Sequence, residues 1–226
     1  MSKDIEISEE DKNYIENVIN WTFPGSRFYY RDTDVDIDVE KTYKVGQIIR
    51  AGIFIDTSLN AKKPCSKVRY IIGSAHAAEM YKTDMCNQAT KDCEICVFHL
   101  NSYFKVMDIY KVKDQYQIFL FHIPMHGIPV LENASFNFDF GDGKGIDYFV
   151  ERARASFDEK LKMEVDEKLE SSMWKQRTND PIGVMADGSL FNLDFQFPPN
   201  EQVYNIEIAC RKIAGDLDPI NLPAQD

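Results

Sequence analysis

Three cysteines and a histidine within 14 residues are the strongest candidates for chemistry in this sequence. They are Cys86, Cys93, Cys96 and His99. Thiolate sulfur and imidazole nitrogen are the ligands that zinc prefers, and a Cys-x2-Cys pair is typical of half of a structural zinc site. A complete site normally has a second, separate pair, so Cys65, His76 or His126 are alternative ligands. Zinc is the one cofactor that the sequence indicates, and the alternative is that these cysteines simply lie in the core.

Histidines form a second possible metal or catalytic group, which depends on the register of one hairpin. With a two-residue turn at Lys113–Asp114, His122 lies opposite Lys105, and His99, His122 and His126 share a face. A three-residue turn separates His99 from the other two. Glu79, three residues after His76, is a candidate general base for a metal-bound water.

An acidic ladder is the most regular polar feature of the chain. Asp32, Asp34, Asp36, Asp38 and Glu40 alternate with apolar residues over 31–40. A period of two predicts a strand with one acidic face. Such a strand either protects a sheet edge or meets a basic protein partner. The spacing lacks the glycine and glutamate of an EF-hand calcium loop.

The other polar patterns exclude several enzyme classes. The chain has no phosphate-binding Walker loop, no G-x-G-x-x-G turn and no G-x-S-x-G elbow. The middle of the chain, residues 41–131, is basic and offers a candidate nucleic-acid patch. Its members would be Lys62, Lys63, Lys67, Arg69, Tyr70, Tyr81 and Lys82. The net charge of −11 disfavours nucleic acid as a partner.

The elements that must position these residues alternate irregularly along the chain. Ser8 and the acids after it predict a helix over 9–21. Further strands are expected at 45–56, 67–73, 103–112, 115–123, 135–140, 190–195 and 204–210. Apolar residues four apart from Phe149 to Met173 predict a long helix at about 147–175, which either breaks or changes neighbours along its length. This helix could also join two copies of the chain in a homodimer.

Composition bounds the class of protein. With 226 residues, 44% hydrophobic and 28% charged, the chain has the composition of a folded protein, expected as a single domain over 1–226. Five cysteines, no secretory signal and no long apolar run favour a soluble protein of the reducing cytoplasm. The order of elements predicts an α+β fold, an antiparallel or mixed sheet with the two helices packed on it.

Two functions follow from these patterns. The first is a non-enzymatic protein that binds a basic partner through Asp32, Asp34, Asp36 and Asp38. The second is a zinc-dependent hydrolase that uses the Cys86–His99 segment or the His99, His122 and His126 group. The sequence does not decide between an enzyme and a binding protein.

Overall fold

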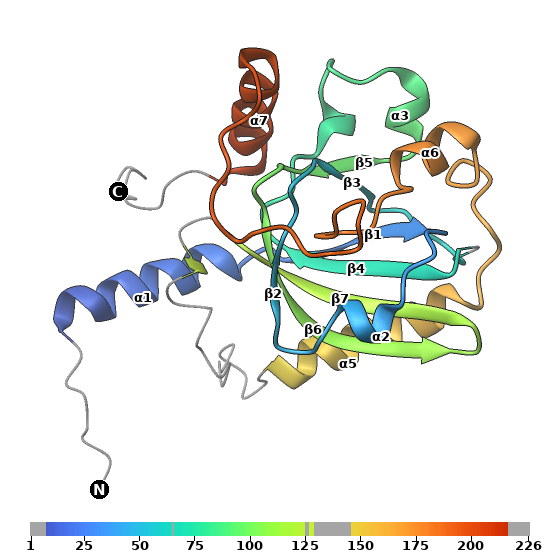
Figure 1. The fold of residues 1–226 in the computed structure, drawn as a ribbon, viewed down its shortest axis with the longest axis horizontal. Coiled ribbons are helices and arrows are strands. Elements are labelled where there is room, and N and C mark those ends of the chain that lie inside the picture. Colours follow the sequence, from blue (N-terminus) through green and yellow to red (C-terminus); the bar gives the residue numbers. More distant parts are fainter. Residues whose placement is uncertain (1–7, 65, 125–126, 129–145, 217–226) are drawn as a thin grey trace, which may run out of the picture.

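A mixed sheet of seven strands forms the centre of the molecule. The computed structural model describes residues 8–64, 66–124, 127–128 and 146–216. The strands are β1 (Arg27–Thr33), β2 (Ile48–Arg50), β3 (Ile55–Ser58), β4 (Val68–Ser74), β5 (Ile95–Phe98), β6 (Tyr103–Val112) and β7 (Gln115–Ile123). Their order is β2-β6-β7-β4-β1-β3-β5, in which only β4 and β7 pair in parallel (Figure 1). The predicted α+β class is confirmed.

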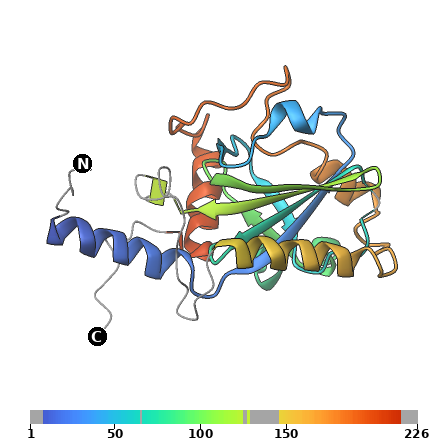
Figure 2. The ribbon, with the colours of Figure 1, turned by 90° about the horizontal axis from the view of Figure 1, so that it is seen from below.

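Helices and one long segment cover the two faces of this sheet. The helices are α1 (Glu9–Thr22), α2 (Val39–Thr42), η1 (Met80–Lys82), α3 (Gln88–Asp92), α5 (Ile146–Lys160), α6 (Ser172–Arg177) and α7 (Glu201–Ala214). Helix α5 lies along one face, where Ala153 and Phe157 are buried (Figure 2). The other face packs against α2 and against residues 179–192, which contribute Ile182 and Val184 to the largest core cluster. In the described residues every helix is too short or too polar to span a bilayer.

Helix α1 forms for the reason that the sequence predicts. The side chain of Ser8 accepts a hydrogen bond from the Asp11 amide, and three acids occupy the first turn. Its C-terminal end is anchored, since Val18 packs with Phe23 and Phe121. The N-terminal part of the helix extends beyond the sheet (Figure 1).

The hairpin of β6 and β7 has the two-residue turn at Lys113–Asp114, but its register changes along the strands. Lys113 has a φ of 53°, and Val112 lies opposite Gln115. A bulge between Val106 and Asp108 then shifts the pairing by one residue. His122 therefore lies opposite Phe104 instead of the predicted Lys105.

Two predicted strands have other structures. The ladder at 31–40 is a strand only as far as Thr33, because Asp38 accepts a hydrogen bond from the Lys41 amide and begins α2. Residues 204–210 are helical, because Asn200 caps α7 and Gly215 ends it in the left-handed region at a φ of 67°.

The predicted strand at 45–56 is two short strands, β2 and β3, which lie far apart in the sheet. The remaining differences lie in the last third of the chain. The predicted long helix ends at Lys160, and Val165 bridges to Lys63 instead. This break is one of the two alternatives that the drifting apolar pattern allows. Residues 190–195 contain a single bridge, from Leu190 to Val184, around the Asp187–Gly188 turn. The predicted strand at 135–140 lies outside the described residues.

Candidate functional site

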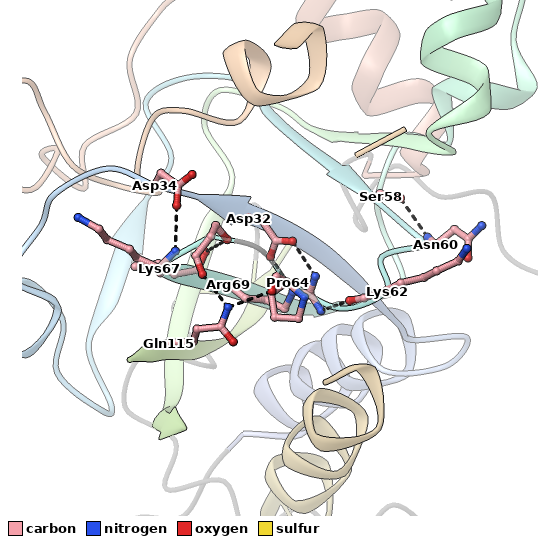
Figure 3. Close-up of polar contacts among 11 residues, drawn as sticks. Asp32, Asp34, Ser58, Asn60, Lys62, Pro64, Lys67, Arg69 and Gln115 are labelled. Carbon is pink, nitrogen blue, oxygen red and sulfur yellow. Dashed lines mark hydrogen bonds and ion pairs between the residues drawn. The ribbon is translucent and has the colours of Figure 1, made fainter. Parts of the chain in front are cut away.

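The acids that were expected to form one face instead make separate contacts within the protein. Asp32 forms two hydrogen bonds of 2.6 Å with the Arg69 guanidinium, which is buried and also donates to the Lys62 carbonyl (Figure 3). Asp34 accepts a hydrogen bond of 3.0 Å from the Lys67 amide. These two acids therefore hold β1 to β4 and to the segment before it.

Asp38 and Asp36 do not form an acidic face for a partner either. Asp38 caps α2 and pairs with Lys41 at 2.7 Å. The side chain of Asp36 is exposed and lies 3.8 Å from the Lys67 ammonium. The four carboxylates thus form no continuous strand face, because the chain leaves the sheet after Thr33.

The predicted cysteine and histidine ligands are not brought together. Cys96 faces the main core cluster, whereas Cys93 and Cys86 belong to the cluster around Trp174. Burial raises the pKa of the Cys93 thiol, and raises that of Cys96 to about 12. No zinc set forms from these thiols in the described structure.

The histidines and the candidate base have separate positions. His99 and His122 do lie together, in a buried cluster with Asp216 that the sequence patterns do not predict. His76 contacts the carbonyls of Trp21 and Ala214, and Glu79 pairs with Arg27 and Lys82. His126 lies outside the described residues, as does Cys65. Of the proposed nucleic-acid residues, Arg69 and Tyr70 are buried.

A buried arginine forms the centre of a site that the sequence patterns did not single out. Alternation along β1 places Tyr29, Arg31 and Thr33 on the face covered by residues 177–182, and Arg31 is 1% exposed. Its Nη1 donates to the carbonyls of Asp56 and Arg177 at 3.0 and 3.3 Å, and its Nη2 donates to the carbonyl of Asp180 at 2.7 Å. Its Nε has no hydrogen-bond partner.

A carboxylate and a second arginine complete this site. Asp56 on β3 is 9% exposed and accepts a hydrogen bond of 2.7 Å from Nε of Arg177, at the end of α6. Burial raises the pKa of Asp56, and the charges of Arg177 and Arg31 oppose that rise. Burial also lowers the pKa of Arg31, with Asp56 opposing. Arg177 is 40% exposed and connects the buried pair to the surface.

The covering segment is held mainly through its backbone. The Tyr43 hydroxyl donates to the Ile182 carbonyl at 2.7 Å, and the Thr33 hydroxyl donates to the Asn179 carbonyl at 3.0 Å. The cavity beside it, between Thr33 and Asn179, measures about 30 Å³, roughly the volume of one water molecule. Displacing residues 177–182 would leave Arg31 without the carbonyls of Arg177 and Asp180, and would expose it for an anion.

One signal in the sequence could have revealed this site. Arg31 occupies the same strand parity as Tyr29 and Thr33, which are both buried. A charged residue at a core position of a strand is uncommon and requires compensating partners. Those partners come from residues 56 and 177–180, so the sequence alone does not identify them.

Comparison with known proteins gives matches only among solved structures. No protein-family model and no curated protein matches this chain. The type III effector XopAI of Xanthomonas axonopodis pv. citri is 17% identical, with 46% of each chain covered and a TM-score of 0.37. The ADP-ribosyltransferase HopU1 of Pseudomonas syringae pv. Tomato is 13% identical, with 43% of this chain and 45% of that chain covered and a TM-score of 0.36.

A third match is exoenzyme S of Pseudomonas aeruginosa, in complex with human 14-3-3 protein beta and bound to carba-NAD. It is 10% identical, covers 61% of this chain and 62% of its own, and has a TM-score of 0.39. The chain thus spans less than two thirds of the length of each of these structures. TM-scores below 0.5 do not establish a shared fold or activity.

The predicted function is wrong in both its forms. The acidic face for a basic partner is not formed, because Asp32, Asp34 and Asp38 are engaged within the chain. The Cys86–His99 set for a zinc hydrolase is not formed either, whereas His99 and His122 of the second set lie together and His126 lies outside the described residues.

Proposed function

We propose that this protein is an enzyme that binds NAD⁺ at Arg31, Asp56 and Arg177 and transfers its ADP-ribosyl group. The observation that carries the proposal is the buried Arg31 guanidinium, whose hydrogen-bond partners are all main-chain carbonyls. Burying a charge without an ionic partner in direct contact is costly. An anionic ligand would supply that partner, and the carba-NAD bound to the matched exoenzyme S indicates which nucleotide to test first.

The two arginines suit the charged part of such a nucleotide. A pyrophosphate offers several anionic oxygens, and the planar guanidinium fork binds phosphate oxygens in pairs. Arg31 is held in place on β1, whereas Arg177 reaches the site from the end of α6. With Asp56 ionised, the three side chains carry a net charge of +1, which favours an anion.

The carboxylate suits the reaction. Transfer breaks the bond between ribose C1′ and the nicotinamide nitrogen, and nicotinamide leaves as a neutral molecule with the bonding electron pair. The ribosyl group develops positive charge in the transition state, as a sugar does in glycoside hydrolysis. Asp56 is the buried carboxylate of the site, and we propose that it stabilises this charge while a nucleophile of the acceptor attacks C1′.

Access to the site requires a movement of residues 177–182. The adjacent cavity of about 30 Å³ is far smaller than the roughly 300–1,000 Å³ typical of ligand pockets. The segment crosses Arg31 through the carbonyls of Arg177 and Asp180, which an anion would replace. We therefore propose that nucleotide binding and opening of this segment are coupled.

The binding test compares two arginines of similar exposure. Arg177→Ala removes a proposed ligand, and Arg154→Ala removes an arginine that is 46% exposed and pairs with Asp108 on a different part of the sheet. Titration calorimetry with NAD⁺ should show binding to the natural protein, at least about 10-fold weaker binding to Arg177→Ala, and little change for Arg154→Ala. Absent binding to the natural protein, or equal effects of the two variants, would contradict the proposal.

A further inference from the structure

Two histidines and an aspartate converge in the core where β7, the end of β5 and the end of α7 meet. His99, His122 and Asp216 are 3%, 1% and 0% exposed. One potential ligand atom from each residue lies within 4.8 Å of the other two. Among the described residues this is the one group of its kind.

Each member reaches this point through a different element. His122 lies on β7, beyond the bulge that sets its register opposite Phe104. His99 directly follows β5. Asp216 follows α7, where Gly215 adopts a φ of 67° and the Asp216 amide donates to the Arg211 carbonyl at 3.0 Å. This left-handed helix end turns the chain so that the Asp216 side chain enters the core.

Several polar atoms of this cluster are buried without partners. Nδ1 of His122 lies 2.9 Å from the Ser74 hydroxyl, and its Nε2 has no hydrogen bond. Nε2 of His99 lies 2.6 Å from Oδ2 of Asp216, and Oδ1 of Asp216 has no partner. Nδ1 of His99 lies 3.8 Å from Oε1 of Glu207, beyond hydrogen-bond distance. Leaving such atoms unpaired in the core is unfavourable, because each has lost its hydrogen bonds to water.

We propose that His99, His122 and Asp216 bind one divalent transition-metal ion through the two Nε2 atoms and the carboxylate. Two imidazoles and a carboxylate are a common ligand set for Zn²⁺ and for other first-row ions. An ion would satisfy the unpaired Nε2 of His122 and the unpaired oxygen of Asp216. This inference is independent of the proposed use of NAD⁺, and it shares only His99 with the Cys86–His99 set.

The surroundings of the two rings support ligation. In metal sites a ligating histidine usually directs its other ring nitrogen toward a hydroxyl, carbonyl or carboxylate. Ser74 occupies that position for His122, and Glu207 is the nearest carboxylate for His99. A proton shared between His99 and Asp216 would account for their short contact without a metal, but it leaves Nε2 of His122 unpaired.

The site also joins distant parts of the chain. His99 and Asp216 are 117 residues apart, and the middle of α7 contributes the buried Glu207. An ion held between β7, the end of β5 and the end of α7 would fasten α7 to the sheet. Binding should therefore stabilise the folded state, since the unfolded chain lacks the preformed site.

The experiment measures metal content and metal-dependent stability of the full chain. Protein purified without chelators is analysed for first-row metals, stripped with a chelator, and titrated with Zn²⁺ while its thermal unfolding is followed. We expect about one ion per chain or, for the stripped protein, saturable Zn²⁺ binding with a rise in Tm. Natural protein without metal and without a Zn²⁺-dependent rise in Tm would overturn the proposal.

Variants identify which side chains hold the ion. His122→Gln should weaken Zn²⁺ binding at least about 100-fold, and Ser74→Ala should weaken it by about 10- to 100-fold. Two controls should bind as the natural protein does: His76→Gln, a histidine outside the set, and the double variant Cys93→Ser with Cys96→Ser. The Co²⁺ absorption spectrum of each folded variant reports its ligands directly. Full Zn²⁺ binding by a folded His122→Gln protein, or its loss in the cysteine double variant, would contradict the assignment.

Discussion

At the scale of single residues, the acidic ladder contributes to the stability of the fold. Asp32 neutralises Arg69, which is 1% exposed, whereas the Asp36 side chain faces solvent. Asp32→Asn would leave a buried guanidinium without its anion, and we expect a loss of about 2–4 kcal/mol in the free energy of unfolding. Asp36→Asn should change it by less than about 0.5 kcal/mol. Urea unfolding of both variants checks this, and equal effects would refute it.

The cysteines allow a second prediction at this scale. Burial raises the pKa of the Cys96 thiol to about 12 and that of Cys210 to about 11, whereas Cys86 is half-buried. Since the thiolate is the nucleophile, Cys96 and Cys210 should remain unmodified by iodoacetamide at about pH 8 in the folded protein. Cys86 should react, and peptide mass spectrometry identifies each site. Rapid labelling of Cys96 before unfolding would show that its thiol is not buried.

Residue patterns can identify some members of the functional clusters and not their partners. His99 and His122 are candidates from the sequence because imidazole chemistry is easily recognised, although their proximity depends on a hairpin register. Asp216 carries no local signal, because it meets His99 across 117 residues of chain. Arg31 resembles an ordinary member of a charged strand, and only its covering segment shows that it is buried.

At the scale of elements, the chain that follows the segment over Arg31 packs closely against a glycine. Gly52 has a φ of 73°, and a Cβ there would lie 2.6 Å from the Phe191 ring. Gly188 has a φ of 83° with nothing within 4 Å. Alanine at either position adopts a disfavoured backbone conformation, but Gly52→Ala also displaces Phe191.

We therefore expect Gly52→Ala to lower the free energy of unfolding by at least about 1 kcal/mol more than Gly188→Ala does. Thermal or urea unfolding of the pair measures the difference, because both variants share the backbone strain. If Gly188→Ala were the more damaging change, residues 183–191 would not pack against Gly52 as described.

Elements with strong local signals can be predicted, and those that depend on distant contacts cannot. The α1 helix and the β6–β7 hairpin have caps and turns that act locally. For residues 204–210 the alternation of Tyr204, Ile206 and Ile208 favours a strand, although those side chains are not buried. The helix instead buries Glu207 and Cys210, three residues apart, and its caps lie outside the alternating run.

At the scale of the whole molecule, the arrangement of strands brings the proposed chemistry together. Strand β1 lies inside the sheet and contributes Arg31, while β3 beside it contributes Asp56. The last third of the chain then crosses the sheet and supplies Arg177. The parallel pairing of β4 with β7 and this return crossing are long-range events, so no local pattern in the sequence specifies them.

The measurement that tests the central claim most directly is the release of nicotinamide from NAD⁺, with a mixture of proteins present as acceptors. We predict release above the uncatalysed rate by the natural protein and a decrease of at least about 100-fold in Asp56→Asn, because the variant cannot stabilise positive charge at the ribose. Circular dichroism confirms that the variant is folded. The absence of release by the natural protein, or undiminished release by folded Asp56→Asn, would contradict the account.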